Sequence, residues 1–198
     1  MNKSTILNSR VIIGSFILGA LVSSTVHQFA SKPKSIATQC RAMSDSHNYT
    51  SDANEALYRK LSARYTEVPE STLRETIEYA GVYANPDFPK QQDLLAVIAV
   101  ESSFNPKAKS HLKSDPAIGL TQIRPKAWGH KLHKVDLATI ENQIKYGSEI
   151  LSHNYKRVND KSLALHAYNL GLTSILKGKR SKTYVVKYER ELKYIMNA

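Results

Sequence analysis

Apolar residues recur at three- and four-residue steps through most of the chain after residue 54, the spacing of one face of an amphipathic helix. The helices that this pattern predicts cover residues 56–65, 73–83, 89–100, 140–151, 162–168 and 183–195. No run alternates apolar and polar residues over the length of a strand, and no repeat of 20 to 50 residues is present. The pattern therefore predicts an all-α fold with at most a minor β element.

Helix boundaries are predicted from capping residues and from proline. Asn105-Pro106 should end the helix over 89–100, because the residue before a proline avoids the helical region. Asp136 is the predicted N-cap of the helix through Ile140, and Asp160 that of the helix that follows.

The first 26 residues have a different pattern. Lys3 and Arg10 precede an uncharged, apolar run over residues 11–26, which as a helix would span roughly 24 Å, slightly less than the bilayer core. A basic start before an apolar run is typical of a secretory signal peptide or a retained signal anchor, and both interpretations stay open for residues 1–26. Residues 27–54 are polar and without helical periodicity, so we interpret them as a flexible linker, followed by one domain over residues 55–198.

Composition narrows the classes of function. The 198 residues contain one cysteine, Cys40, which excludes an intramolecular disulfide framework and any multi-cysteine metal site. The net charge of +11 is distributed as +4 over residues 1–40, −4 over 41–101 and +11 over 102–198. A basic excess favours an acidic polymer, a membrane or nucleic acid as partner. The basic run at residues 177–182 lacks interleaved aromatic residues, so we interpret it as a solvated loop and expect no nucleic-acid partner.

Glu101 is the first candidate catalytic residue. It follows a stretch over residues 94–100 that is apolar on nearly every face, so the last turn of a core helix presents a carboxylate. Burial disfavours the charged form and raises the pKa of a carboxyl group, which can then act as a general acid near neutral pH. The alternative is an exposed glutamate at a helix end. If Glu101 is the acid, activity should be highest on the acidic side of neutral.

Four motifs follow in order along the second half of the chain. They are Glu101-Ser102-Ser103-Phe104-Asn105-Pro106, then Gly119-Leu120-Thr121-Gln122-Ile123, then Ala167-Tyr168-Asn169-Leu170-Gly171, and Tyr184-Val185-Val186-Lys187-Tyr188. Together they resemble the motifs of the soluble lytic transglycosylases, the lysozyme-like muramidases of glycoside hydrolase family 23, over about residues 90–190.

The resemblance implies a lysozyme-like α-helical domain with Glu101 as its single catalytic acid and base. The residues that it places along the sugar cleft are Ser102, Gln122, Tyr168 and Asn169, and it places Tyr184 close to the carboxylate. It implies no cofactor. His130 and His133 lack a third ligand at a fitting spacing, so we predict no metal site either.

The sequence departs from the family pattern at three places. Thr121 replaces the usual methionine, which we expect to change the cleft floor; Asp115-Pro116 precede the second motif; and residues 111–114 look like a short insertion. Asp115 could be a second carboxylate or a turn residue, and a turn residue is the commoner role. Trp128 could pack in the core or stack on a sugar, and His166 could be part of the cleft wall.

The function that the resemblance implies is cleavage of the β-1,4 bond between N-acetylmuramic acid and N-acetylglucosamine in peptidoglycan, with formation of 1,6-anhydro-muramic acid ends. Two alternatives stay open: a hydrolytic muramidase of the same fold, and a non-catalytic peptidoglycan-binding component of an envelope-spanning machine. We expect peptidoglycan strands as partner, the cytoplasmic membrane if the N-terminal segment is retained, and a secretion or conjugation assembly as a further candidate. The catalytic domain is then expected in the periplasm or cell envelope.

Overall fold

The computed structural model describes residues 51–132 and 135–197. The segment predicted as signal or anchor lies outside this range, as do Cys40, His133 and residues 27–50 of the predicted linker. Residues 51–54, which we had also assigned to the linker, belong instead to a helix that runs to residue 64.

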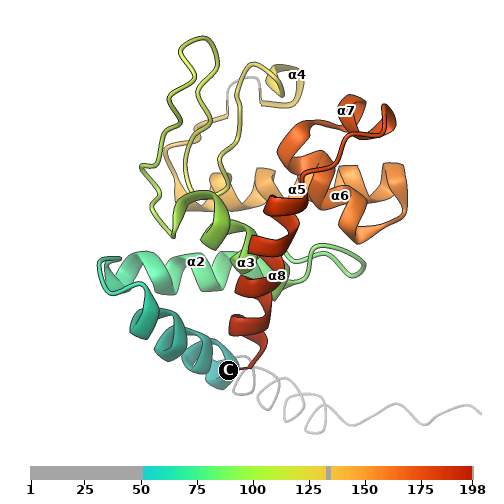
Figure 1. Cartoon of the computed structure of the whole chain (residues 1–198). Helices are drawn as coiled ribbons and strands as arrows, with labels where there is room; N and C mark the ends of the chain where they lie inside the picture. The colour runs from blue at the N-terminus through green and yellow to red at the C-terminus, as the bar shows by residue number, and fades with distance from the viewer. Residues whose placement is uncertain (1–50, 133–134, 198) are drawn as a thin grey trace, which may run out of the picture.

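Seven further helices follow (Figure 1). They are α2 (Glu70–Val82), α3 (Gln91–Ser102), α4 (Gly129–Leu132), α5 (Ile140–Val158), α6 (Lys161–Leu170), α7 (Leu172–Leu176) and α8 (Lys182–Met196). The described residues contain no strand, only two isolated antiparallel bridges that join Ile118 to Lys109 and to Ile123. The predicted all-α fold with a minor β element is therefore confirmed, and the short helices α4 and α7 are additions to it.

Helix α3 forms the centre of the main hydrophobic core. Its residues from Leu94 to Ile98 are fully buried, as expected for a helix that is apolar on nearly every face. It packs most extensively on α8 and also contacts α2 and α5, as Figure 1 shows. The Tyr188 hydroxyl on α8 donates a hydrogen bond to the buried Asp93 carboxylate at the start of α3, so the two helices are joined by a polar contact as well. Helix α3 is thus held against α8 by apolar packing and by a hydrogen bond at its N-terminal end.

Polar contacts decide where the helices begin and end. The N-cap of α5 is Thr139, whose hydroxyl accepts a hydrogen bond from Asn142 N; our assignment of Asp136 was wrong. Asp136 accepts from Ala138 N, within the turn before the helix. The predicted cap Asp160 is confirmed, since its carboxylate accepts from Leu163 N at the start of α6.

Helix α3 ends at Ser102, before the predicted Asn105-Pro106 stop. Ser103 and Phe104 both adopt positive φ angles, 51° and 63°, which turn the chain out of the helix. The Phe104 side chain is fully buried and lies with its ring centroid 4.7 Å from that of Tyr65. Burial of this aromatic ring explains why the chain leaves the helix here, with the proline only continuing the turn.

The long segment between α3 and α4 is anchored by Gln143 on α5. The buried Gln143 side chain accepts a hydrogen bond from Leu120 N and donates to the carbonyl oxygens of Pro106 and Leu137. A Cβ atom at Gly119, whose φ is +76°, would lie 2.3 Å from the Gln143 side chain, so only glycine fits there. The segment is therefore ordered by these side-chain to backbone bonds together with the backbone bonds of its two isolated bridges.

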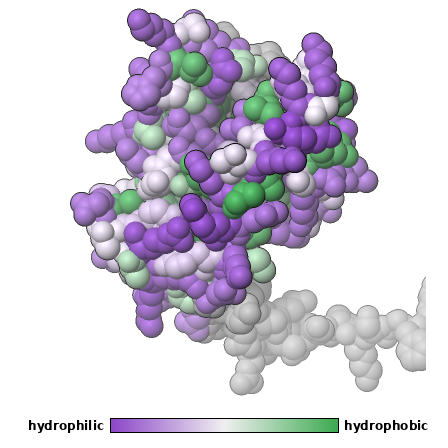
Figure 2. Space-filling view, viewed as in Figure 1, coloured by the Kyte–Doolittle hydropathy of each residue, from purple (hydrophilic) through white to green (hydrophobic). Residues whose placement is uncertain are grey.

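The face of the protein shown in Figure 2 is mostly hydrophilic, with small hydrophobic patches between hydrophilic areas. Within residues 51–132 and 135–197, no helix has the length and apolar character needed to cross a bilayer.

Candidate active site

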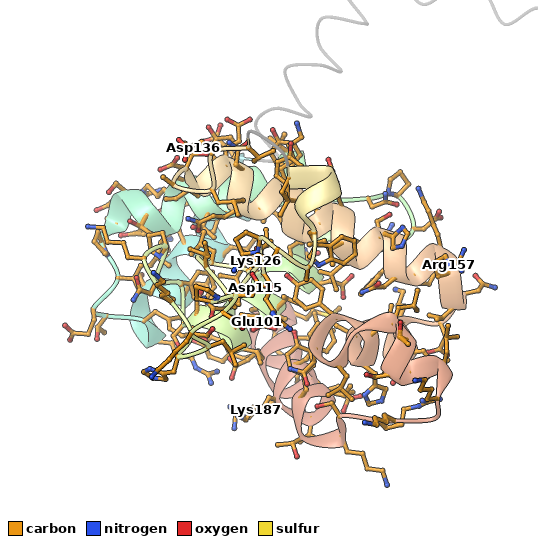
Figure 3. The ribbon with its side chains drawn as sticks, turned by 90° about the horizontal axis from the view of Figure 1, so that it is seen from above. Glu101, Asp115, Lys126, Asp136, Arg157 and Lys187 are labelled. Carbon is orange, nitrogen blue, oxygen red and sulfur yellow. The ribbon has the colours of Figure 1, made fainter. Side chains whose placement is uncertain are left out.

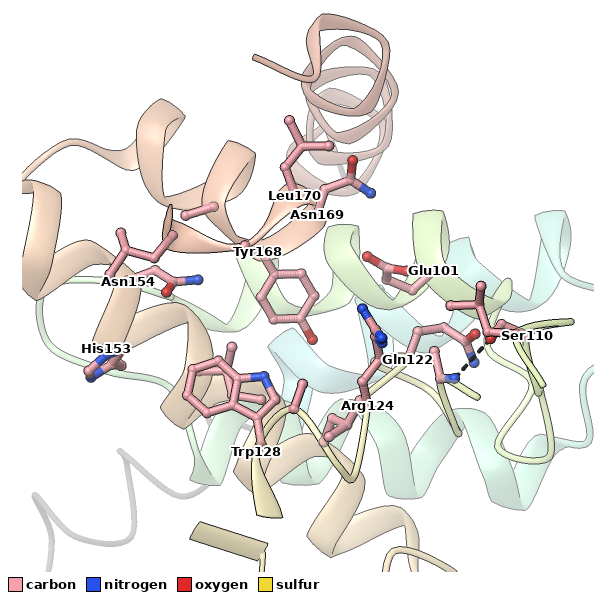
Figure 4. A pocket seen from close by; sticks show the side chains of 18 residues that line it. Glu101, Ser110, Gln122, Arg124, Trp128, His153, Asn154, Tyr168, Asn169 and Leu170 are labelled. Atoms are coloured by element: carbon pink, nitrogen blue, oxygen red, sulfur yellow. Dashed lines mark hydrogen bonds between the residues drawn. The ribbon is translucent and has the colours of Figure 1, made fainter. Parts of the chain in front are cut away.

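A cleft of about 380 Å³ lies between the last turn of α3, the segment after it, α5 and the end of α6 (Figure 4). Residues on its walls include Glu101, Gln122, Arg124, Trp128, His153, Asn154, Tyr168 and Asn169. They come from four separate stretches of the chain that the helical core brings together.

Glu101 is the only carboxylic acid among the described residues of this cleft. It is the second-last residue of α3, where the core helix meets the cleft, and burial raises its pKa to about 7. A hydrogen bond from the Tyr184 hydroxyl to Oε1, 2.8 Å long, lowers the pKa but does not offset the effect of burial. A carboxyl group in this state carries a proton for much of the time near neutral pH, as a general acid must.

Tyr184 and Tyr168 place two phenol groups around the carboxyl. Tyr184, on α8, is buried, and burial raises its pKa well above the usual value, so it stays neutral and donates to Glu101. Tyr168, at the end of α6, donates through its hydroxyl to the Thr121 carbonyl oxygen, 2.6 Å away. Burial raises the pKa of Tyr168 too. One tyrosine therefore orients the acid, and the other forms part of the cleft wall in a fixed position.

Gln122 lines the cleft in a strained backbone conformation, with a φ of 50°. Its Nε2 atom donates to the carbonyl oxygens of Gly119, 2.9 Å away, and Ala108, 3.2 Å away, which fixes the amide group. None of the residues in the described ranges donates a hydrogen bond to its Oε1 atom. The side chain thus offers a fixed hydrogen-bond acceptor.

Of the predicted site residues, Gln122, Tyr168 and Asn169 lie with Glu101 in the cleft, and Tyr184 contacts the carboxyl from the α8 side. Ser102 is not brought to the cleft, since its hydroxyl donates to Ile98 O within α3.

Thr121 does not form the cleft floor, contrary to our expectation. Its side chain is fully buried and donates a hydrogen bond to Gln143 O, 2.6 Å away. A Cβ atom at Gly147 would lie 2.6 Å from the Thr121 methyl group, so the threonine fills the space that this glycine leaves. The departure from the family pattern is accommodated behind the cleft wall.

Asp115 is not among the residues that line the cleft. Its buried carboxylate accepts hydrogen bonds from Lys126 N and Ala127 N and forms an ion pair with Arg124. It is therefore a loop-closing residue. His166 accepts a hydrogen bond from Ser181 N and is not among the cleft residues. It is therefore not part of the cleft wall, contrary to our expectation.

Several cleft residues were not predicted from sequence, namely Arg124, His153 and Asn154. Trp128 packs on the small second core of Ile123, Leu132 and Ile150, which confirms one of the two roles considered for it, and it also lines the cleft. His153 and Asn154 could have been found from their helical spacing with Ile150, because all three lie on one face of α5.

No three histidine, cysteine, aspartate or glutamate side chains gather as a potential metal site within the described ranges.

Comparison with known families decides the assignment. A family model described as the transglycosylase SLT domain matches residues 80–190, more than half of the chain. The chain belongs to the transglycosylase SLT family. The SLT match covers Glu101, Gln122, Tyr168 and Tyr184, and it begins ten residues before the motif region that we predicted. The activity of this family is of the peptidoglycan transglycosylase type, with peptidoglycan as substrate. No curated protein sequence matches the chain significantly.

Proposed function

We propose that the protein is a lytic transglycosylase that cleaves the β-1,4 bond between N-acetylmuramic acid and N-acetylglucosamine and leaves a 1,6-anhydro-muramic acid end. The observation that carries this proposal is one buried carboxyl group, with a pKa of about 7, in a cleft where no other described residue is acidic. Ordinary retaining and inverting glycosidases use two carboxyl groups, one on each side of the bond. A reaction that needs only one fits this cleft better.

In the proposed reaction, Glu101 first donates its proton to the glycosidic oxygen, and the bond to muramic acid C1 breaks. The 2-acetamido group of the same sugar stabilises the positive charge that develops at C1, in place of a second carboxylate. The Glu101 carboxylate then takes the proton from the C6 hydroxyl group, whose oxygen bonds to C1. The proton returns to the enzyme and no water is consumed, so the reaction is a lyase reaction.

The neighbouring side chains support this sequence of proton transfers. The Tyr184 hydroxyl holds Oε1 and stabilises the ionised carboxylate between the two steps. The fixed Oε1 acceptor of Gln122 matches the N–H of an acetamido group, and Asn169 offers further hydrogen bonds at the cleft edge. Trp128 provides an apolar ring surface of the kind that packs against a sugar.

We further propose that the enzyme acts in the cell envelope, where it opens the wall locally. The basic and apolar N-terminal segment directs export, whether as a cleaved signal or a retained anchor, and the +11 charge of residues 102–198 favours a polymer that bears carboxylates. Fractionation of cells that express the full chain would test the location, and recovery of the protein in the cytosol would contradict it.

The products from purified sacculi test the reaction itself. Mass spectrometry of the released muropeptides should show anhydro ends for the wild type and their loss, by at least about a hundred-fold, for Glu101→Gln. Glu189→Gln, on the exposed face of α8, is the matched control and should keep full activity. Products heavier by one water would show a hydrolase instead, and full activity of Glu101→Gln would exclude this residue as the acid.

A further inference from the structure

Arg124 is a cleft residue with no role in the reaction described above. Its side chain lines the same cleft as Glu101 and is half exposed, at 51%. Figure 4 shows it extending into this pocket. Among the described residues of the cleft, it is the only lysine or arginine, so it supplies the one permanent positive charge there.

A buried carboxylate holds the Arg124 side chain in place. Asp115 Oδ2 lies 3.2 Å from Arg124 Nε, and the Asp115 side chain is only 7% exposed. The same carboxylate accepts hydrogen bonds from Lys126 N, 2.9 Å away, and Ala127 N, 3.2 Å away, which fix the backbone directly after Arg124. Asp115 therefore fixes both the guanidinium group of Arg124 and the backbone that follows it.

The outer edge of this guanidinium has no partner in the described part of the protein. Asp115 pairs with the guanidinium at Nε, and none of the groups that the structure describes accepts a hydrogen bond from Nη1 or Nη2. The two Nη groups form a planar fork of donors that matches the two oxygens of a carboxylate. The only carboxyl group among the described residues of the cleft, that of Glu101, carries a proton for much of the time near neutral pH and accepts a hydrogen bond from Tyr184.

We propose that Arg124 is the binding site for a carboxylate of the peptide stem, and that Asp115 is its positioning residue. This inference rests on the proposed function. The glycan strand itself is uncharged, whereas the peptide attached to the lactyl group of muramic acid carries carboxylates, and it leaves the strand on the sugar whose C1 bond is cut. A fixed guanidinium beside the catalytic acid selects strands that still carry their peptides.

Three forms of the same glycan strands test the proposal: strands with native stems, strands whose stem carboxyl groups have been converted to amides, and strands freed of peptides by an amidase, with the newly exposed lactyl carboxyl groups then converted to amides. For the wild type, kcat/KM should be highest on native stems. Arg124→Gln should lower kcat/KM on native stems roughly ten-fold or more, mainly through KM, because a bidentate charged hydrogen bond is lost. The preference for native over amidated stems should then disappear, and Arg124→Lys should restore part of it.

The control variant is Arg157→Gln, which removes the same charge at the exposed end of α5, far from Glu101 in Figure 3, and should leave all three rates unchanged. Asp115→Asn should reduce the preference for native stems as Arg124→Gln does, whereas a loop-closing role alone would lower the three rates equally. An Arg124→Gln variant that loses the same factor on all three substrates would overturn the proposal.

Failure of the proposed function gives a different result, the absence of anhydro products from every substrate with the wild type. The site can be tested separately by calorimetry in a Glu101→Gln background, which binds without cutting. Weaker binding of native than of amidated stems, or equal binding of the two, would refute the carboxylate site whatever the reaction is.

Discussion

Replacing Tyr184 with phenylalanine removes the one hydrogen bond that the Glu101 carboxyl group accepts from the described part of the chain. With that bond the pKa of Glu101 is about 7, and the bond lowers it against the effect of burial. A hydrogen bond to a charged acceptor stabilises by about 1.5–3 kcal/mol and one to a neutral acceptor by about 0.5–1.5 kcal/mol, so its loss favours the protonated form by roughly 1–1.5 kcal/mol. At about 1.36 kcal/mol per unit, the pKa should rise by about one unit.

The pH dependence of kcat/KM reports this change, because it follows the pKa of the acid in the free enzyme. The acid must be protonated to act, so activity falls as the pH rises through its pKa. For the wild type this fall should centre near pH 7, and for Tyr184→Phe near about pH 8. The release of anhydro-muropeptides from soluble glycan strands, measured from pH 4 to pH 10, is the assay.

Tyr188→Phe is the matched control for this experiment. It removes a hydroxyl group from the same helix pair, one turn further along α8, where the bond is to Asp93 and not to Glu101. It should lower stability and leave the alkaline limb in place. An alkaline limb that stays put or moves to lower pH in Tyr184→Phe, or a wild-type profile flat to pH 9, would refute the assignment of Glu101 as a buried acid.

Three further predictions concern stability and the support of the cleft. Glu101→Gln should raise the free energy of unfolding at pH 8 by up to about 3 kcal/mol, because the pKa of Glu101 is about 7 in the folded protein against an ordinary value of 4.5, so the charged carboxylate destabilises the folded state there. Urea titrations should show this gain vanish below about pH 4.5. Gly147→Ala should lower the free energy of unfolding by about 1–3 kcal/mol and impair activity, because its Cβ would lie 2.6 Å from the Thr121 side chain. At Gly129 a Cβ would meet nothing within 4 Å, so Gly129→Ala should show neither loss in the same denaturation and activity measurements. Asp160→Ala removes the N-cap of α6 and should lower the unfolding free energy by about 1 kcal/mol, and a melting temperature equal to that of the wild type would contradict the cap.

The helices and the buried carboxyl group of Glu101 were predictable because both depend on local patterns. The apolar run before Glu101 identified the core helix and the anomaly at its end in a single stretch of sequence. Capping was only partly predictable, since Asp136 and Thr139 are both good N-cap residues and lie three positions apart. The choice between them depends on where α5 must begin for Ile140 and Ile144 to pack on the core. The sequence does not show that packing.

The cleft wall formed by the loop was harder to predict. Arg124 and Asp115 lie in a segment without periodicity, so no face can be assigned to them, and their contact depends on how the segment folds back on itself. Thr121 was misplaced for a related reason: the side chain turns towards Gly147, which is 26 positions away in sequence, and only the packing of α5 shows the space there. Tyr184 was placed correctly by its motif, although its bond to Glu101 joins residues 83 positions apart.

The polarity of α3 adds to the control of Glu101. The aligned peptide dipoles of a helix leave partial negative charge at its C-terminal end, where an anion is disfavoured and a neutral acid is not. Glu101 lies in the last turn of α3, at that end. The direction in which the core helix runs therefore opposes ionisation of the acid, in addition to burial, and this bias lies in the backbone, where side-chain substitutions around the cleft cannot remove it. Transfer of the same glutamate to the first turn of a helix would give an equally buried group that ionises more readily and serves less well as an acid.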